Sequence, residues 1–159
     1  MANELTGLIN RIEASIRSDR NMRITLSSVL AVHKPRIFEQ GQDATGGKIG
    51  TYGTNPISIS KKNQARNTGR TYFKGGYAEY KSAVGKNPGF VILRNTDQMY
   101  ADYGLVGSNG DYGFGFQNTV NYNKSQWMEE KYKKDIFDLS SNEEKVLADV
   151  LTALILQDI

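Results

Sequence analysis

The chain has no cysteine among its 159 residues and a single histidine, His33. Without cysteine there is no disulfide framework, no thiolate zinc site and no cysteine nucleophile. One histidine cannot supply a two-histidine metal site, and a Ser–His–Asp triad would have to use His33. The lack of cysteine also fits a reducing compartment.

Long apolar runs are missing too. No apolar stretch approaches the roughly 18 residues that a membrane-spanning helix needs. The start of the chain, MANELTGLINRIEASIR, lacks the apolar centre of about 7–15 residues that marks a secretory signal. We therefore expect a chain that is intact from Met1, is made in the cytosol and has no membrane partner.

The net charge is only +3, from 20 basic and 17 acidic residues, which is too small to indicate nucleic-acid binding by itself. The charge is unevenly distributed, however. Residues 61–86 carry seven basic residues against one acidic residue, a net +6, whereas residues 129–159 carry four lysines against eight acids, a net −4. The small total thus conceals a basic segment and an acidic end.

Two helices are predicted at the N-terminus. The first has one apolar stripe and Asn3 as its N-cap, and the second covers about residues 26–40. Pro35 either kinks the second helix or restarts it, and Gly41 marks its end. The stripe of the first helix consists of Leu5, Leu8, Ile9, Ile12 and Ile16.

Residues 41–89 are poor in apolar side chains and contain ten of the sixteen glycines. A loop of this length inside a compact domain is usually functional or disordered. We therefore interpret residues 41–89 as a long projecting loop or arm. A loop that orders only on assembly would lose its conformational entropy at that step, so residues 41–85 should exchange amide hydrogens readily in the isolated protein.

The second half of the chain predicts a sheet followed by helices. Residues 90–118 are expected to form an antiparallel meander of three or four strands, with a hairpin turn at Asn109–Gly110. A short helix with Trp127 is expected over residues 120–131. The chain as a whole, residues 1–159, is predicted to be one α+β domain.

The last helix carries two overlapping capping-box signals, Ser140 with Glu143 and Ser141 with Glu144. Its apolar side chains would contribute on the order of 9–18 kcal/mol if all were buried. We therefore expect this helix to pack against the sheet or against a neighbouring subunit. The apolar positions are Val146, Leu147, Val150, Leu151, Leu154 and Ile155.

No catalytic set stands out, and no cofactor or metal site is expected. The stretch GQDATGGK at 41–48 fails the P-loop pattern, because Gly47 stands where lysine is needed, and is interpreted as a flexible glycine turn. His33 is interpreted as a structural or surface histidine. Three acidic pairs are candidates for a carboxylate mechanism: Asp97 with Asp102, Asp135 with Asp138, and Glu143 with Glu144. Capping explains the last pair and a turn explains Asp97, so we do not expect an enzyme.

The basic segment is the sharpest local signal. Its cations are spaced by 1, 4, 4 and 4 residues, so most would share one face if the stretch were helical, and aromatic residues follow closely. Such a segment can bind single-stranded nucleic acid, form a solvated mobile loop, or dock on an acidic protein surface such as a neighbouring copy of the chain. The candidate partner-binding residues are Lys61, Lys62, Arg66, Arg70, Lys74, Tyr72 and Phe73.

The order of motifs resembles the phage virion morphogenesis family, also called tail-completion or head–tail connector proteins. The motifs are RIFEQGQD at 36–43, GGKIGTY at 46–52, DYGFGF at 111–116, Tyr122 followed by Glu129, and IFDLSSNE at 136–143. The resemblance covers about residues 26–156.

This resemblance implies a structural virion protein of the neck that forms a homomeric ring between the portal or adaptor and the tail. The implied partners are further copies of the chain, portal or adaptor proteins, tail-tube or tail-terminator proteins, and packaged DNA passing through the ring. The implied location is the virion, assembled in the host cytoplasm. The alternative is a nucleic-acid-binding module that uses residues 61–86 and loses affinity steeply with salt.

Overall fold

The computed structural model describes residues 2–60, 69–108 and 110–159 and shows an α+β fold. N-terminal helices, two small two-stranded antiparallel sheets and a C-terminal helix make up this described part. In chain order the elements are α1 (Ala2–Ile16), α2 (Asp19–Phe38), β1 (Ile57–Ser60), β2 (Arg70–Phe73), α3 (Gly76–Ala83), α4 (Gln98–Asp102), β3 (Tyr103–Ser108), β4 (Asp111–Phe116), α5 (Thr119–Tyr132) and α6 (Ser141–Asp158).

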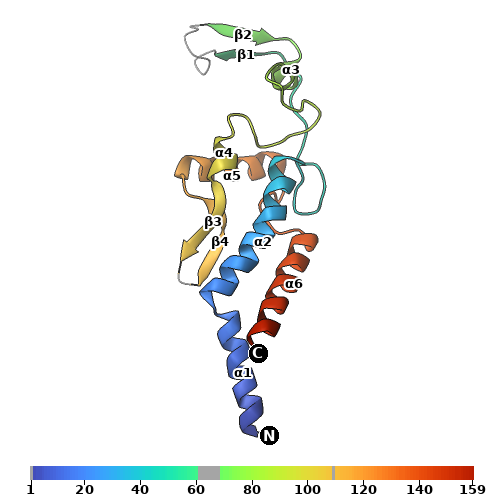
Figure 1. The fold of residues 1–159 in the computed structure, drawn as a ribbon. Coiled ribbons are helices and arrows are strands. Elements are labelled where there is room, and N and C mark those ends of the chain that lie inside the picture. The colour runs from blue at the N-terminus through green and yellow to red at the C-terminus, as the bar shows by residue number, and fades with distance from the viewer. Residues whose placement is uncertain (1, 61–68, 109) are drawn as a thin grey trace.

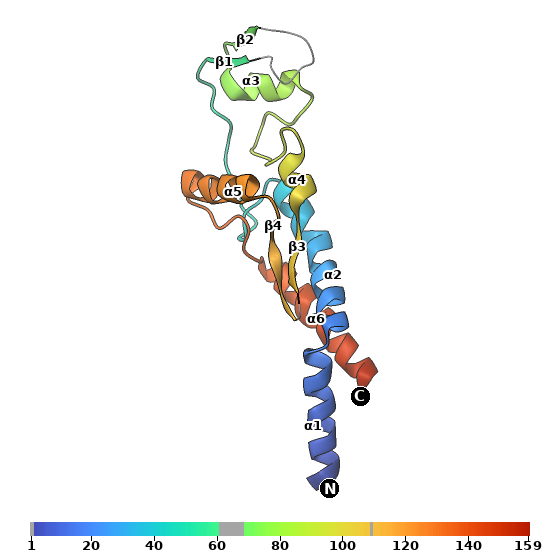
Figure 2. The same cartoon turned by 90° about the vertical axis from the view of Figure 1, so that its left-hand side faces the viewer.

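The molecule is elongated (Figure 1). Helices α2 and α6 lie side by side along its length, and α1 extends beyond them at the end where both termini lie. The β1–β2 hairpin and α3 form the opposite end, and α5 lies across the molecule between the two (Figure 2). The hairpin and α3 are thus far from the N-terminal helix.

Helix α1 begins at Ala2, so Asn3 lies inside the helix and the prediction of Asn3 as N-cap is wrong. Helix α2 begins at Asp19, earlier than predicted, because the hydroxyl of Ser18 accepts a hydrogen bond from the Asn21 amide and caps the helix. It continues through Pro35 to Phe38. Gly41 then turns the chain with φ +62°, as expected for a residue just beyond a helix.

The segment after α2 returns to the protein interior. One carboxylate oxygen of Asp43 accepts hydrogen bonds from the Thr45 and Gly47 amides at 2.9 and 3.0 Å, which closes a tight turn. Ile49 and Tyr52 then join the hydrophobic core. The first third of residues 41–89 is therefore fixed to the hydrophobic core and anchors the remainder of this segment to it.

The sheet differs from the predicted meander. Residues 90–93 form no strand: the Tyr52 hydroxyl bonds both the amide and the carbonyl of Ile92 at 3.0 Å, and the Val91 amide donates to Gly50. Because these partners occupy the Val91 amide and both backbone groups of Ile92, these groups are not available to pair with a neighbouring strand. Residues 98–102, also expected to be extended, form helix α4. The described residues accordingly contain two two-stranded sheets and no sheet of three or four strands.

The predicted hairpin is confirmed. Strands β3 and β4 pair in antiparallel register from Tyr103 opposite Phe116 to Ser108 opposite Asp111, with a two-residue connection. Gly110 in that connection has φ +84°, a conformation that favours glycine. The helix with Trp127 is confirmed as α5.

The core lies where the end of α2 meets the β3–β4 hairpin and the irregular segments that follow α2 and precede α4 and α6. Its most deeply buried members are Ile37, Phe38, Ile49, Val91 and Ile136. Helix α6 packs against α2 and the sheet, and its N-terminus forms the Ser140–Glu143 capping box, the first of the two predicted. Of its six predicted apolar positions only Leu154 is buried, so the rest of that face is only partly covered.

Candidate functional site

The predicted partner-binding residues divide into three groups. Lys61, Lys62 and Arg66 lie outside the described residues. Arg70, Tyr72 and Lys74 are exposed, and Arg70 and Tyr72 share the outer face of β2, opposite Ser60 and Ser58. Arg70–Phe73 is a strand, so the condition for a shared helical face is not met at these positions.

Phe73 has a structural role. It points to the other face of β2, where its ring meets Tyr80 at 5.6 Å between centroids. Tyr80 contacts Tyr77 at 5.3 Å, and Tyr77 contacts Tyr52 at 5.4 Å. This series of rings joins the β1–β2 hairpin to the core through α3, and aromatic contacts of this kind add about 0.5–1.5 kcal/mol each beyond area burial.

A buried polar cluster joins α2 to α6. It consists of His33 and Arg36, one turn apart on α2, and Glu143 in the first turn of α6. The Arg36 Nε donates to Glu143 Oε1 at 2.7 Å, and His33 Nδ1 lies 3.0 Å from Glu143 Oε2. All three side chains are at most 7% exposed. Capping was therefore a correct but incomplete explanation of Glu143.

The shorter contact of Nδ1 assigns the tautomer of His33. The Glu143 carboxylate, at 3.0 Å, only accepts, so we assign the proton to Nδ1, and the Arg36 Nη2 atom 3.2 Å from Nδ1 then makes no hydrogen bond to it. Nε2 then accepts from the Tyr103 hydroxyl at 2.7 Å, which agrees with a neutral ring. His33 is thus a structural histidine, and both nitrogens are occupied.

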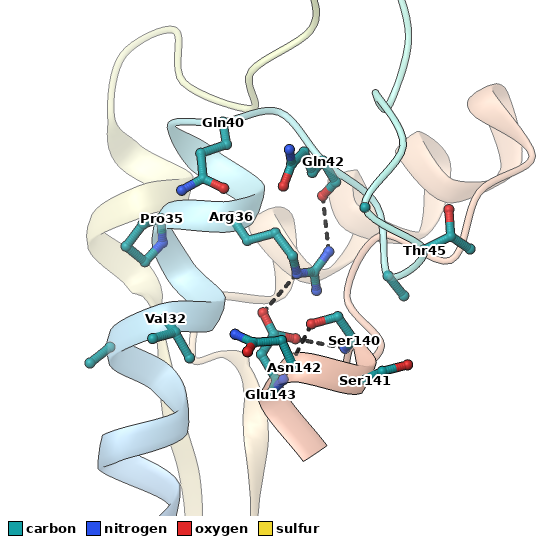
Figure 3. Close-up of a pocket in the computed structure, with 13 residues that line it drawn as sticks. Val32, Pro35, Arg36, Gln40, Gln42, Thr45, Ser140, Ser141, Asn142 and Glu143 are labelled. Atoms are coloured by element: carbon teal, nitrogen blue, oxygen red, sulfur yellow. Dashed lines mark hydrogen bonds and ion pairs between the residues drawn. The ribbon is translucent and has the colours of Figure 1, made fainter. Parts of the chain in front are cut away.

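A hollow of about 520 Å³ lies beside this cluster, between α2, the turn at 42–46 and the start of α6 (Figure 3). Arg36 faces it, but its donors are committed to Glu143 and to the carbonyls of Gln42 and Asp138, at 2.7–2.9 Å. Ser140 and Glu143 cap the helix N-terminus there. The charges lining the hollow are therefore already neutralised within the chain.

The members of two of the three acidic pairs lie in separate surroundings. Asp97 is held by Arg94 at 2.8 Å and Lys86 at 3.4 Å, while Asp102 accepts from the Asn118 amide and the Asn121 side chain. Glu143 is buried and Glu144 is exposed. Within the described ranges no group of three or more His, Asp or Glu side chains could hold a metal ion, and no helix is long and apolar enough to cross a membrane.

Acid is expected to weaken the fold through His33. Burial lowers the pKa of His33 from its ordinary value, although the hydrogen bond and charge of Glu143 pull it upward. Between the folded and the unfolded pKa, His33 is therefore protonated in the unfolded chain and neutral in the folded chain. As pH falls from about 7.5 to 5.5, the free energy of unfolding should decrease by at most about 1.4 kcal/mol per pH unit. Urea unfolding at several pH values measures this slope.

The variant His33→Gln is the control for that experiment, because His33 is the chain's one histidine. It should be less stable at pH 7.5 but should lose most of the slope over this range. A slope that is unchanged in His33→Gln would contradict the assignment.

Among the exposed large apolar side chains, one group lies at the end with the termini and one on α5. At the end with the termini these are Leu5 and Ile9 of α1 and Leu156 of α6, at 60%, 45% and 66% exposure. On α5 they are Val120, Tyr122 and Trp127, each more than half exposed. Single exposed apolar residues are ordinary, but groups on neighbouring elements indicate interaction surfaces.

Comparison of the chain with protein-family models, with curated proteins and with solved structures finds no match to any of the three.

Proposed function

We propose that this chain is a non-enzymatic structural protein of the phage neck, a tail-completion or head–tail joining protein that forms a homomeric ring. In this proposal the ring stands between the portal or adaptor and the tail, in the virion, and packaged DNA passes through it. The proposal combines the sequence resemblance with the surfaces of the molecule.

The observation that carries the proposal is the uncovered apolar stripe of α1. Leu5, Ile9 and Ile16 are all at least 40% exposed, although they fall on one side of the helix. Helix α1 extends past the rest of the molecule and packs against α6 and α2 (Figures 1 and 2). An amphipathic helix with an open apolar stripe is stabilised when a partner covers it.

A ring requires two different surfaces on each copy. Contacts between unlike patches repeat head to tail and close when the rotation between copies allows it. The stripe of α1 and the exposed side chains of α5 are separate surfaces on different elements, as a head-to-tail contact needs. The β1–β2 hairpin and α3 provide a third surface, at the end of the molecule opposite α1 (Figure 1).

The test is the oligomeric state of the purified protein. Light scattering after size exclusion and negative-stain microscopy should find a closed ring, and Leu5→Glu with Ile9→Glu should convert it to monomers with unchanged circular dichroism. Asn10→Glu, at an exposed polar position of the same helix, is the matched control and should keep the ring. A wild-type protein that stays monomeric at high concentration, or a double variant that still forms rings, would refute the proposal.

A nucleic-acid-binding module remains the second candidate, favoured by the shared outward face of Arg70 and Tyr72 on β2. Exposed aromatic and basic side chains together are typical of single-strand binding. This candidate requires affinity to fall by about 0.7–0.9 log units per log unit of salt for each phosphate contact. Binding that does not respond to salt would remove it.

A further inference from the structure

A second cavity, of about 640 Å³, lies between α3, α5 and the irregular segments at 51–53 and 91–95. Its size falls in the range of about 300–1,000 Å³ that ligand pockets occupy. Aliphatic side chains from residues 91–93 and two methionines, Met99 and Met128, form much of its wall, together with aromatic rings. Methionine adapts its shape to varied apolar partners, so this wall suits the insertion of an apolar side chain.

A buried ammonium group lies at this wall. Lys81 of α3 is only 2% exposed, and its Nζ donates to the Arg94 carbonyl at 2.7 Å and to the Asn95 side-chain oxygen at 3.3 Å. The same Nζ lies 5.4 and 5.5 Å from the ring centroids of Tyr52 and Tyr77. All four partners are neutral, and in the described part of the chain no carboxylate forms an ion pair with Lys81. A buried cation held by neutral groups leaves a positive potential in the cavity.

Helix α5 adds cations on the other side. Lys124, Trp127, Met128 and Lys131 follow one another at helical spacing and line the cavity from one face of α5. Lys131 lies 4.8 Å from the Trp127 ring centroid. The two exposed lysines therefore flank an exposed tryptophan and a half-buried methionine.

The charge of the cavity is one-sided. Four basic side chains line it, namely Lys81, Arg94, Lys124 and Lys131, and no acidic residue is among the described residues that do so. Arg94 is the exception in being paired, with Asp97 and Glu39. Three lysines thus remain to meet negative charge from outside the chain.

We propose that this cavity is the docking site for an acidic, apolar segment of a partner protein. An apolar or aromatic side chain of the segment enters between Trp127, Met128 and residues 91–93. Carboxylates next to that side chain pair with Lys124 and Lys131, and one is attracted toward Lys81. Charge complementarity of this kind sets specificity and speeds association.

The shape of the walls favours a protein segment over a nucleic acid. Stacking of bases requires several open ring faces, but Tyr52 is buried and Tyr77 half-buried, which leaves Trp127 as the one mainly exposed ring of those three. Aliphatic and thioether groups fill much of the remaining wall. Trp127 also belongs to the exposed α5 residues of the proposed ring, so the peptide experiment uses the Leu5→Glu, Ile9→Glu variant, in which the ring is expected to be absent. None of the α1 residues lines the cavity, so this variant keeps the docking site intact.

The test uses Trp127 as its own reporter, since it is the chain's one tryptophan. The probe is the capped peptide acetyl-Asp-Leu-Phe-Asp-amide, and its neutral counterpart carries asparagine at both acidic positions. The acidic peptide should change the Trp127 fluorescence saturably and bind about tenfold more tightly than the neutral one at low salt. The double variant Lys124→Gln with Lys131→Gln should reduce that preference to about threefold or less.

Two further variants separate charge at the cavity from charge elsewhere. Lys145→Gln changes an exposed lysine on α6 and should leave peptide binding unchanged. Lys81→Met removes the buried charge but keeps an unbranched side chain, and it should also weaken binding of the acidic peptide. If Lys81→Met does not fold, the double variant on α5 decides the question.

Four outcomes would overturn the inference. They are equal binding of the two peptides, no saturable change at millimolar peptide, tighter binding of single-stranded oligothymidylate at the same site, and a Trp127 signal that depends on protein concentration alone. The third would assign the cavity to nucleic acid and the fourth to a second copy of the chain. Failure of the ring test would leave the peptide result intact, so the two proposals are separable.

Discussion

Replacing Glu143 by alanine is expected to lower the free energy of unfolding by about 3–5 kcal/mol, because it leaves the buried Arg36 guanidinium without its counter-charge. The Glu143 carboxylate is 2% exposed, so water cannot readily take its place. The substitution also removes the side-chain half of the capping box, in which Glu143 Oε2 accepts from the Ser140 amide at 2.7 Å. A single carboxylate thus holds the start of α6, the end of α2 and His33 together.

The electrostatics of Glu143 agree with this role. Burial alone would raise the pKa of Glu143, but hydrogen bonds from Arg36, His33 and the Ser140 amide hold the pKa below its ordinary value. The group therefore stabilises the fold above its unfolded pKa, and that contribution is lost as pH falls through the lower folded pKa. The effect of Glu143→Ala should accordingly be largest near neutral pH and smaller in acid.

The adjacent Glu144 supplies the matched control. It is exposed, and Glu144→Ala should change the free energy of unfolding by no more than about 0.5 kcal/mol. Glu143→Gln keeps the size of the side chain and one acceptor oxygen, so it should fall between the other two variants. Urea unfolding followed by circular dichroism measures all three. A loss below about 1 kcal/mol for Glu143→Ala would show that Arg36 is satisfied by carbonyls alone, contrary to this account.

The sequence predicted the elements whose signals are local. The apolar stripe of α1, the Ser140–Glu143 cap and the β3–β4 hairpin each depend on residues a few positions apart, and each element formed. Helix α2 was predicted too short, because residues 19–25 are mostly polar and offer little periodicity. Its true start depends on Ser18, one residue whose capping role is visible only with the backbone in place.

The errors and omissions come from contacts distant in sequence. Residues 90–93 are as apolar as a strand, but Tyr52, forty positions before Ile92, bonds the amide and the carbonyl of Ile92. Glu143 is 110 positions from His33, so no spacing rule could join them. The cavity at α5 gave a partial signal: Lys124, Trp127, Met128 and Lys131 lie at i, i+3, i+4 and i+7, and could have been recognised as one face. That these residues lie at the same cavity as Lys81 could not be predicted from the sequence.

Gly76→Ala is expected to detach α3 and the β1–β2 hairpin from the rest of the protein. Gly76 begins α3 with φ +70°, and a Cβ there would lie 2.5 and 2.6 Å from the carbonyl oxygens of Asn55 and Gly53. That approach exists because the Gly53 carbonyl accepts from the Tyr77 amide at 2.8 Å and caps the helix, since the N-cap residue Gly75 has no side chain to do so. The strained φ costs about 1–2 kcal/mol, and the overlap with fixed backbone adds about 1–3 kcal/mol.

Gly85→Ala distinguishes the two causes, since Gly85 has nearly the same φ, +71°, but nothing lies within 4 Å of a Cβ there. It should show the conformational strain alone. Hydrogen exchange measures both variants: Gly76→Ala should expose the amides of α3 and of the β1–β2 hairpin while β3, β4 and α6 stay protected. The ring series from Phe73 to Tyr52 should loosen with α3, because Tyr77 and Tyr80 both belong to that helix. Equal protection of the α3 amides from hydrogen exchange in Gly76→Ala and Gly85→Ala would mean that the Gly53 carbonyl does not hold α3 in place.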